Sequence, residues 1–341
     1  MIIDIKVKTI DESSNIWVLH PGRGKRQFDT FKQANKVFLE MPGVDIEMDD
    51  VDNDEWLRKQ IRYSNEILKL YARSDLASLN RDIDSYSGDS DRYINSQLGN
   101  LKALYFLAKK GDLIIVPDKG HYTQIMIGEI TDDFSVENKM VVDNLAEMPV
   151  HCRNVRWLDI EATKQALSSK LSKQLENRHA IIKIFNDELK LEIFNMLYDK
   201  FIYKDNYCAY FSGERYNSRE IDGIIESLEL LRFVNEANLT VEDNYVNIKI
   251  NFSSPGGFEF CSKNIKAIVA VLFVTVLLNS SSLQQAKDIQ IENSSGSVVE
   301  VDNAYEELMS SLTEDEFQKY REKAQKANTS IGLTANVSLR Q

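Results

Sequence analysis

The sequence predicts a two-domain α+β protein, and three observations support that prediction. The chain has 341 residues, more than a single ordinary domain contains. Its apolar content of 43% is that of a folded globular protein. Short β-branched runs are separated by long intervening segments, without the regular strand–helix alternation of a parallel α/β sheet. We therefore expect an N-terminal small β-barrel with helical insertions, followed by a second α+β domain with a buried apolar helix.

The beginning of the chain has strand and turn patterns. Residues 1–19 alternate between apolar and polar side chains and are rich in β-branched residues, which predicts two strands around a turn at 11–15. The run His20-Pro21-Gly22-Arg23-Gly24 has the composition of a tight turn. Residues 28–38 predict a short helix that leads into a strand.

An acidic segment comes next, since seven of the twelve residues in 44–55 are Asp or Glu. We expect it to be a solvated loop or a helix N-terminus. Apolar residues at helical spacing predict helices in 56–79 and 98–108, the second of which ends before Gly111. The stretch 82–92 between them has the Ser, Gly and Asp content of a loop.

Three strand patterns and a helix pattern complete the first half. Residues 112–117 form a short apolar run bounded by proline, and 124–130 and 154–158 are also apolar and β-branched. We expect each of them to be a strand of the barrel. Apolar residues at helical spacing from 160 to 175 predict a connecting helix, so the domain boundary should fall near 160–180.

The second half of the chain mixes helical and strand patterns. The expected helices are 180–198, 219–233 and the charged segment 304–327, the expected strand is 245–252, and the segment 201–216 is rich in aromatic residues. The expected domains are 1–160 (barrel), 161–180 (connecting helix), 181–300 (α+β domain) and 301–341 (charged helix and tail).

The apolar run Ala267–Leu278 is the unusual feature of the second half. As a helix it would span about 18 Å, which is short of the roughly 30 Å hydrocarbon core of a membrane. Three interpretations are open: a buried core element, a seam between copies of the chain, or a membrane-active segment. The four valines of the run favour a core element packed on the strand at 245–252.

Charge and cysteine content narrow the class of protein. A net charge of -12 excludes a uniformly basic coat for nucleic acid but is compatible with one local basic patch. Cys152, Cys208 and Cys261 are widely spaced, without a CxxC pair, which predicts a reducing compartment and gives no zinc framework. Because the first residues lack a secretory signal pattern, we expect a cytoplasmic protein that does not act at a membrane.

Three motifs carry a resemblance to known proteins. They are Lys110-Gly-Asp-Leu-Ile-Ile-Val-Pro117, Ile127-Gly-Glu-Ile130 and His151-Cys-Arg-Asn-Val-Arg-Trp-Leu158. This series resembles the N-terminal domain of Mrr-like restriction proteins and the wider group of PUA/EVE-like barrels. The segment 15–22, followed by Phe28 and Phe31, is similar to the family's opening strand and Gly-rich turn. The resemblance covers about residues 1–160, and the segments 44–55 and 82–92 depart from the family's compact form.

The resemblance implies a barrel whose mouth accepts a nucleobase, often a modified or flipped one. Such a pocket needs aromatic walls for stacking and basic groups for phosphate contact. The aromatic candidates are Trp17, Phe28, Tyr122 and Trp157. The candidates for phosphate contact are Arg23, Lys25, Arg26, Arg153 and Arg156. Core packing is the competing role for Trp17 and Trp157, and a solvated loop is the competing role for the cluster 23–26.

Catalytic and metal-binding motifs are sparse. Asp187, Glu188 and Lys190 echo the acid and (Glu/Gln)-x-Lys signature of related restriction nucleases, but they lie in a predicted helix where that site needs a strand. The four histidines have no zinc-binding spacing, and the turn 22–25 lacks the length of a P-loop. We therefore expect a protein without a catalytic residue, metal or cofactor.

The resemblance implies a component of a bacterial antiviral (anti-phage) defence system. Its barrel would bind nucleic acid, such as DNA that carries a modified base. Its second domain would assemble copies of the chain or signal to a partner protein of the same system. Two alternatives stay open: a Mg²⁺-dependent restriction-type nuclease, and a scaffold whose acidic surface binds a partner protein.

Overall fold

A computed structural model describes the chain with gaps. The described residues are 2–6, 8–89, 91–120, 124–160, 162–164, 167–177, 179–198, 200–204, 206–213, 225–226, 228–230, 232, 246–251, 256–262, 265–278, 288–292, 307–308, 310–331, 333–334 and 338–340. They belong to two compact units. One is Ser13–Lys190, here the central unit, and the other is Met1–Glu12 with Leu191–Gln341, here the terminal unit.

The two ends of the chain share the terminal unit. Strand β1 (Ile2–Lys6) pairs in parallel with β15 (Asp288–Glu292), and β2 (Lys8–Ile10) pairs in parallel with β11 (Lys200–Tyr203). The unit boundaries therefore differ from the predicted domain boundaries. Residues 1–12, predicted as part of the barrel domain, belong to the terminal unit. Alternation along a segment predicts a strand but does not identify the strand beside it.

The central unit is built on one curled, half-barrel sheet of eight strands. In chain order these are β3 (Ile16–Leu19), β4 (Lys36–Phe38), β5 (Leu113–Pro117), β6 (Gln124–Ile130), β7 (Lys139–Val141), β8 (Pro149–Trp157), β9 (Ala162–Thr163) and β10 (Ile181–Lys183). Their order is β10-β3-β5-β6-β8-β4, with β7 beside β8 and β9 beside β6. Strands β3 and β5 pair in parallel, and the other described pairs are antiparallel. The predicted strands at 112–117 and 124–130 are confirmed, and β8 begins earlier than predicted.

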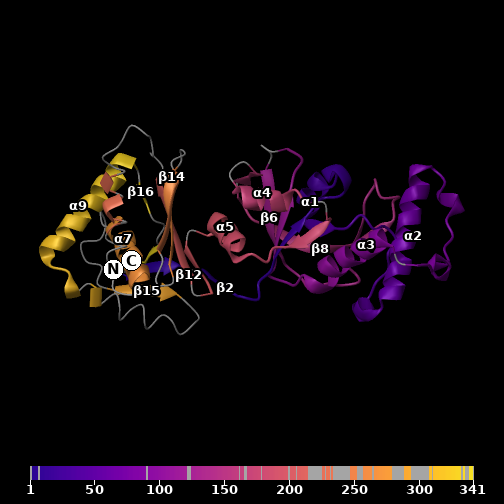
Figure 1. Cartoon of the computed structure of the whole chain (residues 1–341), viewed down its shortest axis with the longest axis horizontal. Coiled ribbons are helices and arrows are strands. Elements are labelled where there is room, and N and C mark those ends of the chain that lie inside the picture. Colours follow the sequence, from indigo (N-terminus) through magenta and orange to yellow (C-terminus); the bar gives the residue numbers. More distant parts are fainter. Residues whose placement is uncertain are drawn as a thin grey trace. The chain divides into compact units, whose positions relative to one another are not determined.

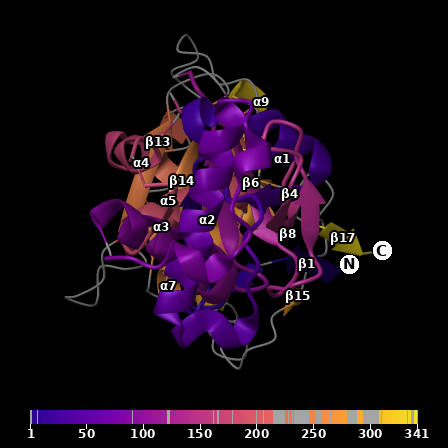
Figure 2. The same cartoon turned by 90° about the vertical axis from the view of Figure 1, so that its right-hand side faces the viewer.

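The helices of the central unit begin at polar caps. Helix α2 (Asp54–Ala72) follows Asn53, whose side chain accepts the Trp56 N–H, and α3 (Arg92–Lys102) follows Asp91, whose carboxylate accepts the Ile94 N–H. They lie side by side (Figure 1), and Figure 2 shows α2 in front of β4, β6 and β8. The shorter helices are α1 (Phe28–Ala34), α4 (Ser169–Leu175) and the first turn of α5 (Asp187–Leu197).

A buried carboxylate ties the start of β5 to the start of β3. Asp112 is 3% exposed and accepts hydrogen bonds from the Asn15 backbone and side chain, the Trp17 indole N–H and the Lys109 N–H. Four donors on one carboxylate satisfy a charge that would otherwise be costly to bury. These hydrogen bonds therefore fix the start of β3 relative to the start of β5.

The terminal unit contains two sheets. Strands β11, β12 (Asn206–Gly213), β13 (Val246–Asn251), β14 (Gly256–Ser262) and β16 (Leu333–Thr334) form one with β2, in the order β13-β14-β12-β11-β2 with β16 beside β12. Strands β15, β1 and β17 (Ser338–Arg340) form the other. Cys208 on β12 lies opposite Cys261 on β14, and the two form a disulfide. Cys152 is a free, buried thiol. The pairing of two cysteines 53 residues apart departs from the sequence reading of unpaired thiols.

Helices α7 (Ile265–Leu278) and α9 (Glu314–Ile331) pack together in the terminal unit. The Phe273 ring lies 6.0 Å from Phe317 and 6.4 Å from Tyr320, measured between ring centres. Every α7 side chain that the structure describes is buried, including Val271 and Leu277. Across the described residues, no helix combines the length and the apolarity needed to cross a membrane.

Two predicted helices are shorter than their sequence patterns indicate. The predicted helix 160–175 is reduced to α4, because Ala162–Thr163 pair with β6 and the Ser168 hydroxyl caps the helix by accepting the Leu171 N–H. The predicted helix 180–198 begins only at Asp187, because Ile181–Lys183 pair with β3. Over stretches of two or three residues, an apolar pattern fits both the helical and the strand periodicity, so the sequence pattern alone does not distinguish them. Most of the predicted helix 219–233 lies outside the described residues.

Candidate functional site

The turn between β3 and α1 is held by the carboxylate of Glu40. This carboxylate accepts hydrogen bonds from the Arg23 backbone N–H, the Arg26 Nε and the Gln27 side-chain amide. Gly22 has φ 71°, and a Cβ there would collide with the Glu40 carboxylate. The turn therefore needs glycine at this position and presents a fixed backbone to its surroundings.

A pocket of about 610 Å³ lies beside this turn. It is lined by His20, Gly22, Arg23, Gly24, Lys25, Lys119, Lys164, Leu175, Glu176 and Asn177. The walls come from the turn, the loop after β5, the residue after β9 and the C-terminal end of α4. Its volume lies within the range of small-molecule binding sites. All the lining residues belong to the central unit.

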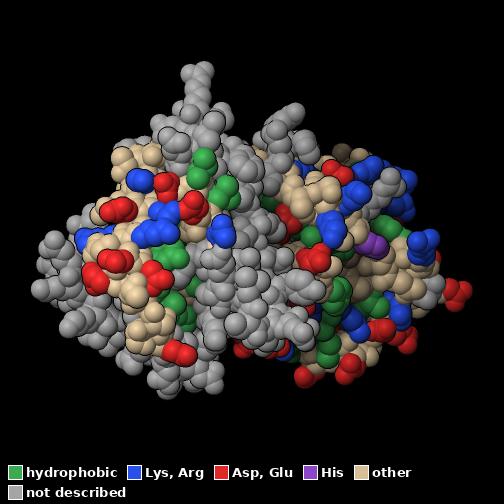
Figure 3. All heavy atoms as spheres, turned by 60° about the vertical axis from the view of Figure 1, so that its left-hand side comes forward, with side chains coloured by type: hydrophobic (Ala, Val, Ile, Leu, Met, Phe, Trp, Pro, Cys, Tyr) green, Lys and Arg blue, Asp and Glu red, His purple; other side chains and the backbone are tan. Residues whose placement is uncertain are grey.

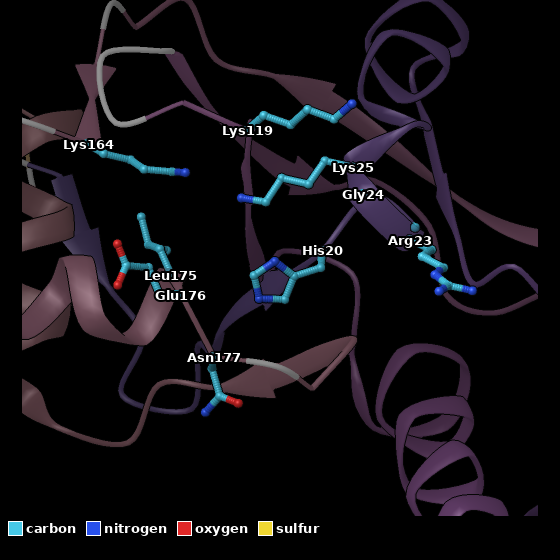
Figure 4. Close-up of a pocket in the computed structure, with 10 residues that line it drawn as sticks. His20, Arg23, Gly24, Lys25, Lys119, Lys164, Leu175, Glu176 and Asn177 are labelled. Carbon is cyan, nitrogen blue, oxygen red and sulfur yellow. The ribbon is translucent and has the colours of Figure 1, made fainter.

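Lys25 and Lys164 meet inside the pocket. Both donate to the carbonyl oxygen of Asp118, Lys25 at 2.8 Å and Lys164 at a shorter distance. Figure 4 shows the two side chains pointing toward one another from opposite walls. Burial and the adjacent ammonium group of Lys164 lower the pKa of Lys25 to about 8, and the carboxylates of Asp118 and Glu176 oppose this only in part. Two cations thus share one neutral acceptor.

His20 contributes an imidazole beneath Lys25 in Figure 4. Its Nε2 is buried and has no hydrogen-bond partner among the described residues, whereas the ring does bond to the Asn177 backbone. Burial, and then the nearby charge of Lys25, lower the pKa of His20 to about 4, so the ring is neutral at pH 7. Buried polar atoms are rarely left unpaired, so this nitrogen is available to pair with an atom of a bound molecule.

The positive charge of the pocket contrasts with the rest of the chain. Its lining has four cationic side chains and one carboxylate, in a protein of net charge -12. On the face that Figure 3 shows, acidic and basic side chains are interspersed among the described residues. Figure 4 shows the side chains of Lys119 and Arg23 directed away from the Lys25–Lys164 pair, toward the edges of the pocket. The arrangement is suited to an anion.

The three described members of the predicted nucleobase pocket pack on or in the hydrophobic core. Trp17 is 4% exposed and donates its indole N–H to Asp112 at 2.9 Å, so it belongs to the core. Phe28 and Trp157 are partly buried against that core, and the Trp157 indole donates to the Phe31 carbonyl. Tyr122 lies outside the described residues. The residue types are compatible with stacking, but β3 and β8 turn Trp17 and Trp157 toward the core.

The five predicted phosphate contacts separate into two groups. Arg23 and Lys25 line the pocket, whereas Arg26 is engaged with Glu40, and Arg156 with Glu129. Arg153 is 0% exposed, which corrects its assignment as a phosphate ligand. Its guanidinium instead donates to the backbone carbonyls of Leu104, Ala108 and Asp132, and so anchors the segment after α3 and the residues after β6 to β8.

The residues of the predicted nuclease alternative lie at the start of α5, a helix as the sequence predicts. Glu188 pairs with Lys170, and the Lys190 ammonium group donates to the Ser14 carbonyl. In the described part of the chain, no group of three His, Cys, Asp or Glu side chains is arranged to hold a metal ion.

Sequence reasoning missed half of the pocket. In the sequence, His20 has no zinc-binding spacing, and no pattern marks Lys119, Lys164 or Glu176 as binding residues. Lys164 is 4% exposed, and a buried lysine in a polar segment has no sequence signature. The signal that was present is the turn, where glycines on either side of Arg23 indicate a constrained, basic loop.

No family model, curated protein or solved structure matches this chain. The resemblance to Mrr-like N-terminal domains and PUA/EVE-like barrels therefore rests on the three sequence motifs.

Proposed function

We propose that the central unit binds nucleic acid and that the pocket of His20, Lys25 and Lys164 receives one of its phosphate groups. The observation that carries the proposal is the convergence of two ammonium groups on the Asp118 carbonyl, in a chain of net charge -12. A phosphate oxygen beside that carbonyl would accept charge-assisted hydrogen bonds from both lysines. It would also supply the negative charge that the pair lacks.

The shape of the site favours a single nucleotide or a strand end over a length of duplex. Proteins that follow a duplex spread their basic residues along the phosphate backbone. Here the cations gather around one pocket of about 610 Å³. We therefore propose that phosphate contact, more than base stacking, anchors the ligand. The role in antiviral defence, the modified base and the assembly function of the terminal unit stay predictions from the resemblance.

Binding of a fluorescein-labelled, single-stranded oligonucleotide with a 5′-phosphate tests the proposal by fluorescence anisotropy. We expect Lys25→Gln and Lys164→Gln each to weaken binding about tenfold, since a hydrogen bond to a charged group contributes about 1.5–3 kcal/mol. With two or three phosphate contacts, log K should fall with log[salt] at a slope of about -1.5 to -2.

Lys69→Gln is the matched control. It removes one lysine charge from α2, where Lys69 is exposed and pairs with Glu66, and Lys69 does not line the pocket. Its affinity should equal that of the wild type. Wild-type affinity in both pocket variants, with native circular dichroism spectra, would contradict the proposal.

A further inference from the structure

We propose that Lys25 is a nucleophilic lysine that condenses with the aldehyde group of a phosphate-bearing compound bound in the pocket. This activity goes beyond nucleic-acid binding and does not depend on it. It follows from the position of the Lys25 amine between a second lysine, a neutral imidazole and a backbone carbonyl.

The surroundings of Lys25 favour its neutral amine. Lys25 and Lys164 share the Asp118 carbonyl, and neither ammonium group has a carboxylate ion-pair partner among the described residues. A second cation beside a partly buried lysine is the arrangement that activates lysine nucleophiles. At pH 7.5 a lysine with a pKa of about 8 is roughly one quarter neutral, whereas an ordinary lysine is neutral in about one molecule in a thousand.

Lys25 is the accessible member of the pair. It is half-buried on the turn, so its amine is open to the pocket, whereas Lys164 is 4% exposed. The charged and titratable groups that face Lys25 are Lys164, Asp118, Glu176 and His20. Lys164 favours loss of the Lys25 proton, while the two carboxylates oppose it.

The reaction is a condensation that needs neither an oxidant nor a reductant. The lone pair of the Lys25 Nζ attacks the aldehyde carbon, and a carbon–nitrogen bond forms. The carbon–oxygen bond of the resulting carbinolamine then breaks, and the oxygen leaves as water with the two protons that the amine carried. The products are one imine and one water molecule for each amine and aldehyde consumed.

The remaining cations define the rest of the substrate. Lys164 meets Lys25 at the Asp118 carbonyl, and Lys119 and Arg23 lie toward the edges of the pocket, so the cations of the lining would hold a phosphate next to the reacting carbon. Two sources share this chemistry. One is a small aldehyde phosphate, and the other is the ring-opened sugar of an abasic site in DNA, which is an aldehyde flanked by phosphates.

Reductive trapping of the full-length protein tests the inference in two arms. One arm uses pyridoxal 5′-phosphate, and the other uses a single-stranded oligonucleotide with one abasic site. Each is incubated at pH 7.5, reduced with sodium borohydride and mapped by peptide mass spectrometry. We expect Lys25 to be modified at least about tenfold faster than the exposed Lys69 and Lys170. Labelling of Lys25 in one arm alone would support the inference and identify the source of the aldehyde.

Three further measurements distinguish a reactive lysine from an accessible one. The labelling rate should rise with a midpoint near pH 8, and pyridoxal without its phosphate should react more slowly. With pyridoxal, which has no phosphate for Lys164 to bind, Lys164→Gln should slow the labelling of Lys25 at pH 7.5 but not at pH 10.5, because it removes the charge that disfavours the ammonium form.

The inference would be overturned if Lys25 were labelled no faster than Lys69 in both arms, or if its labelling rose only near pH 10. Both readouts come from the wild-type protein, so they do not require a variant to fold. If the oligonucleotide fails to bind, the proposed function fails, while the pyridoxal 5′-phosphate arm still decides the reactivity of Lys25.

Discussion

Lys25 and Lys164 donate to the same backbone oxygen, the carbonyl of Asp118. A carbonyl dipole compensates two positive charges less well than a carboxylate does, so the pocket keeps two like charges close together. Like charges held close together lower the free energy of unfolding, and such arrangements are typical of binding sites. The same contact therefore links the stability of the central unit to its affinity for anions.

Lys164→Met should stabilise the protein and weaken anion binding. Methionine keeps the buried aliphatic stem of Lys164 and removes the charge beside Lys25. We expect a gain of about 0.5–1 kcal/mol in the free energy of unfolding, measured by calorimetry at low salt. Lys119→Met is the control, because Lys119 is exposed and directed away from the pair, and it should leave stability unchanged. A loss of stability in Lys164→Met would show that the shared carbonyl stabilises both charges.

Oligonucleotide binding should weaken as the pH rises past 8. The pKa of Lys25 is lowered to about 8, so its ammonium form, which binds the phosphate, is present below that pH and is lost above it. We expect about a tenfold loss of affinity between pH 7 and pH 9.5, measured by anisotropy at constant ionic strength. Lys25→Arg keeps its charge throughout this range, so its affinity should not change with pH. Equal pH profiles for the two proteins would exclude Lys25 as the titrating group.

Trp17→Phe should reduce stability without changing ligand affinity. The substitution removes the indole N–H that Asp112 accepts at 2.9 Å and leaves a buried carboxylate oxygen short of one donor. We expect a loss of about 1–3 kcal/mol in the free energy of unfolding, measured by urea denaturation. A selective loss of affinity, with stability preserved, would instead restore Trp17 to the binding site.

The sequence predicts local structure in this protein better than it predicts strand pairing. The strand at 113–117 is buried on both faces, and its bounding residues are visible in the sequence, so it was predicted almost to the residue. Residues 1–12 have an equally clear strand pattern, yet they pair with β15 and β11, which lie far away in the chain. Residues 181–183, expected in a helix, pair with β3. Pairing over such separations depends on tertiary packing, which periodicity does not encode.

The candidate site shows the same limit. The turn containing Arg23 and Lys25 was predicted because glycines and basic residues are adjacent there. Lys164 was missed because it reaches the pocket through the pairing of β9 with β6. Trp17 and Arg153 have residue types suited to nucleic acid, but the register of β3 and β8 turns them into the core. Residue type predicts possible chemistry, whereas register decides which side chains reach the ligand.

The Cys208–Cys261 disulfide predicts a specific labelling pattern. When the protein is denatured without reductant, iodoacetamide should modify Cys152 alone, and after reduction it should modify all three cysteines. The reason is that Cys208 and Cys261 are directly opposite each other on paired strands, with Cα atoms 4.2 Å apart. Intact-mass spectrometry measures the number of labels. Three labels without reduction would show that the pair is present as thiols, in line with the predicted reducing compartment.

Acid should destabilise the central unit through His151. This residue is 2% exposed, its Nε2 accepts the Ile46 N–H at 3.4 Å, and its Nδ1 has no partner among the described residues. Burial, and then the nearby charge of Lys139, lower its pKa to about 4, and the carboxylate of Asp45 opposes this only in part. The folded protein therefore keeps this ring neutral at pH values where the unfolded chain has already bound a proton.

The sign of the effect follows from proton binding. Between pH 6.5 and pH 4 the unfolded chain binds more protons than the folded one, so the free energy of unfolding falls as the pH falls. The contribution of His151 is about 3 kcal/mol at most, and His20, which has a similarly lowered pKa, adds to the loss. Urea denaturation at a series of pH values measures the total. His151→Gln cannot titrate, so its stability should fall by about 2–3 kcal/mol less over this range than that of the wild type, whatever its stability at pH 7. Parallel profiles of unfolding free energy against pH for the two proteins would mean that protonation of the buried ring does not lower the stability of the folded protein.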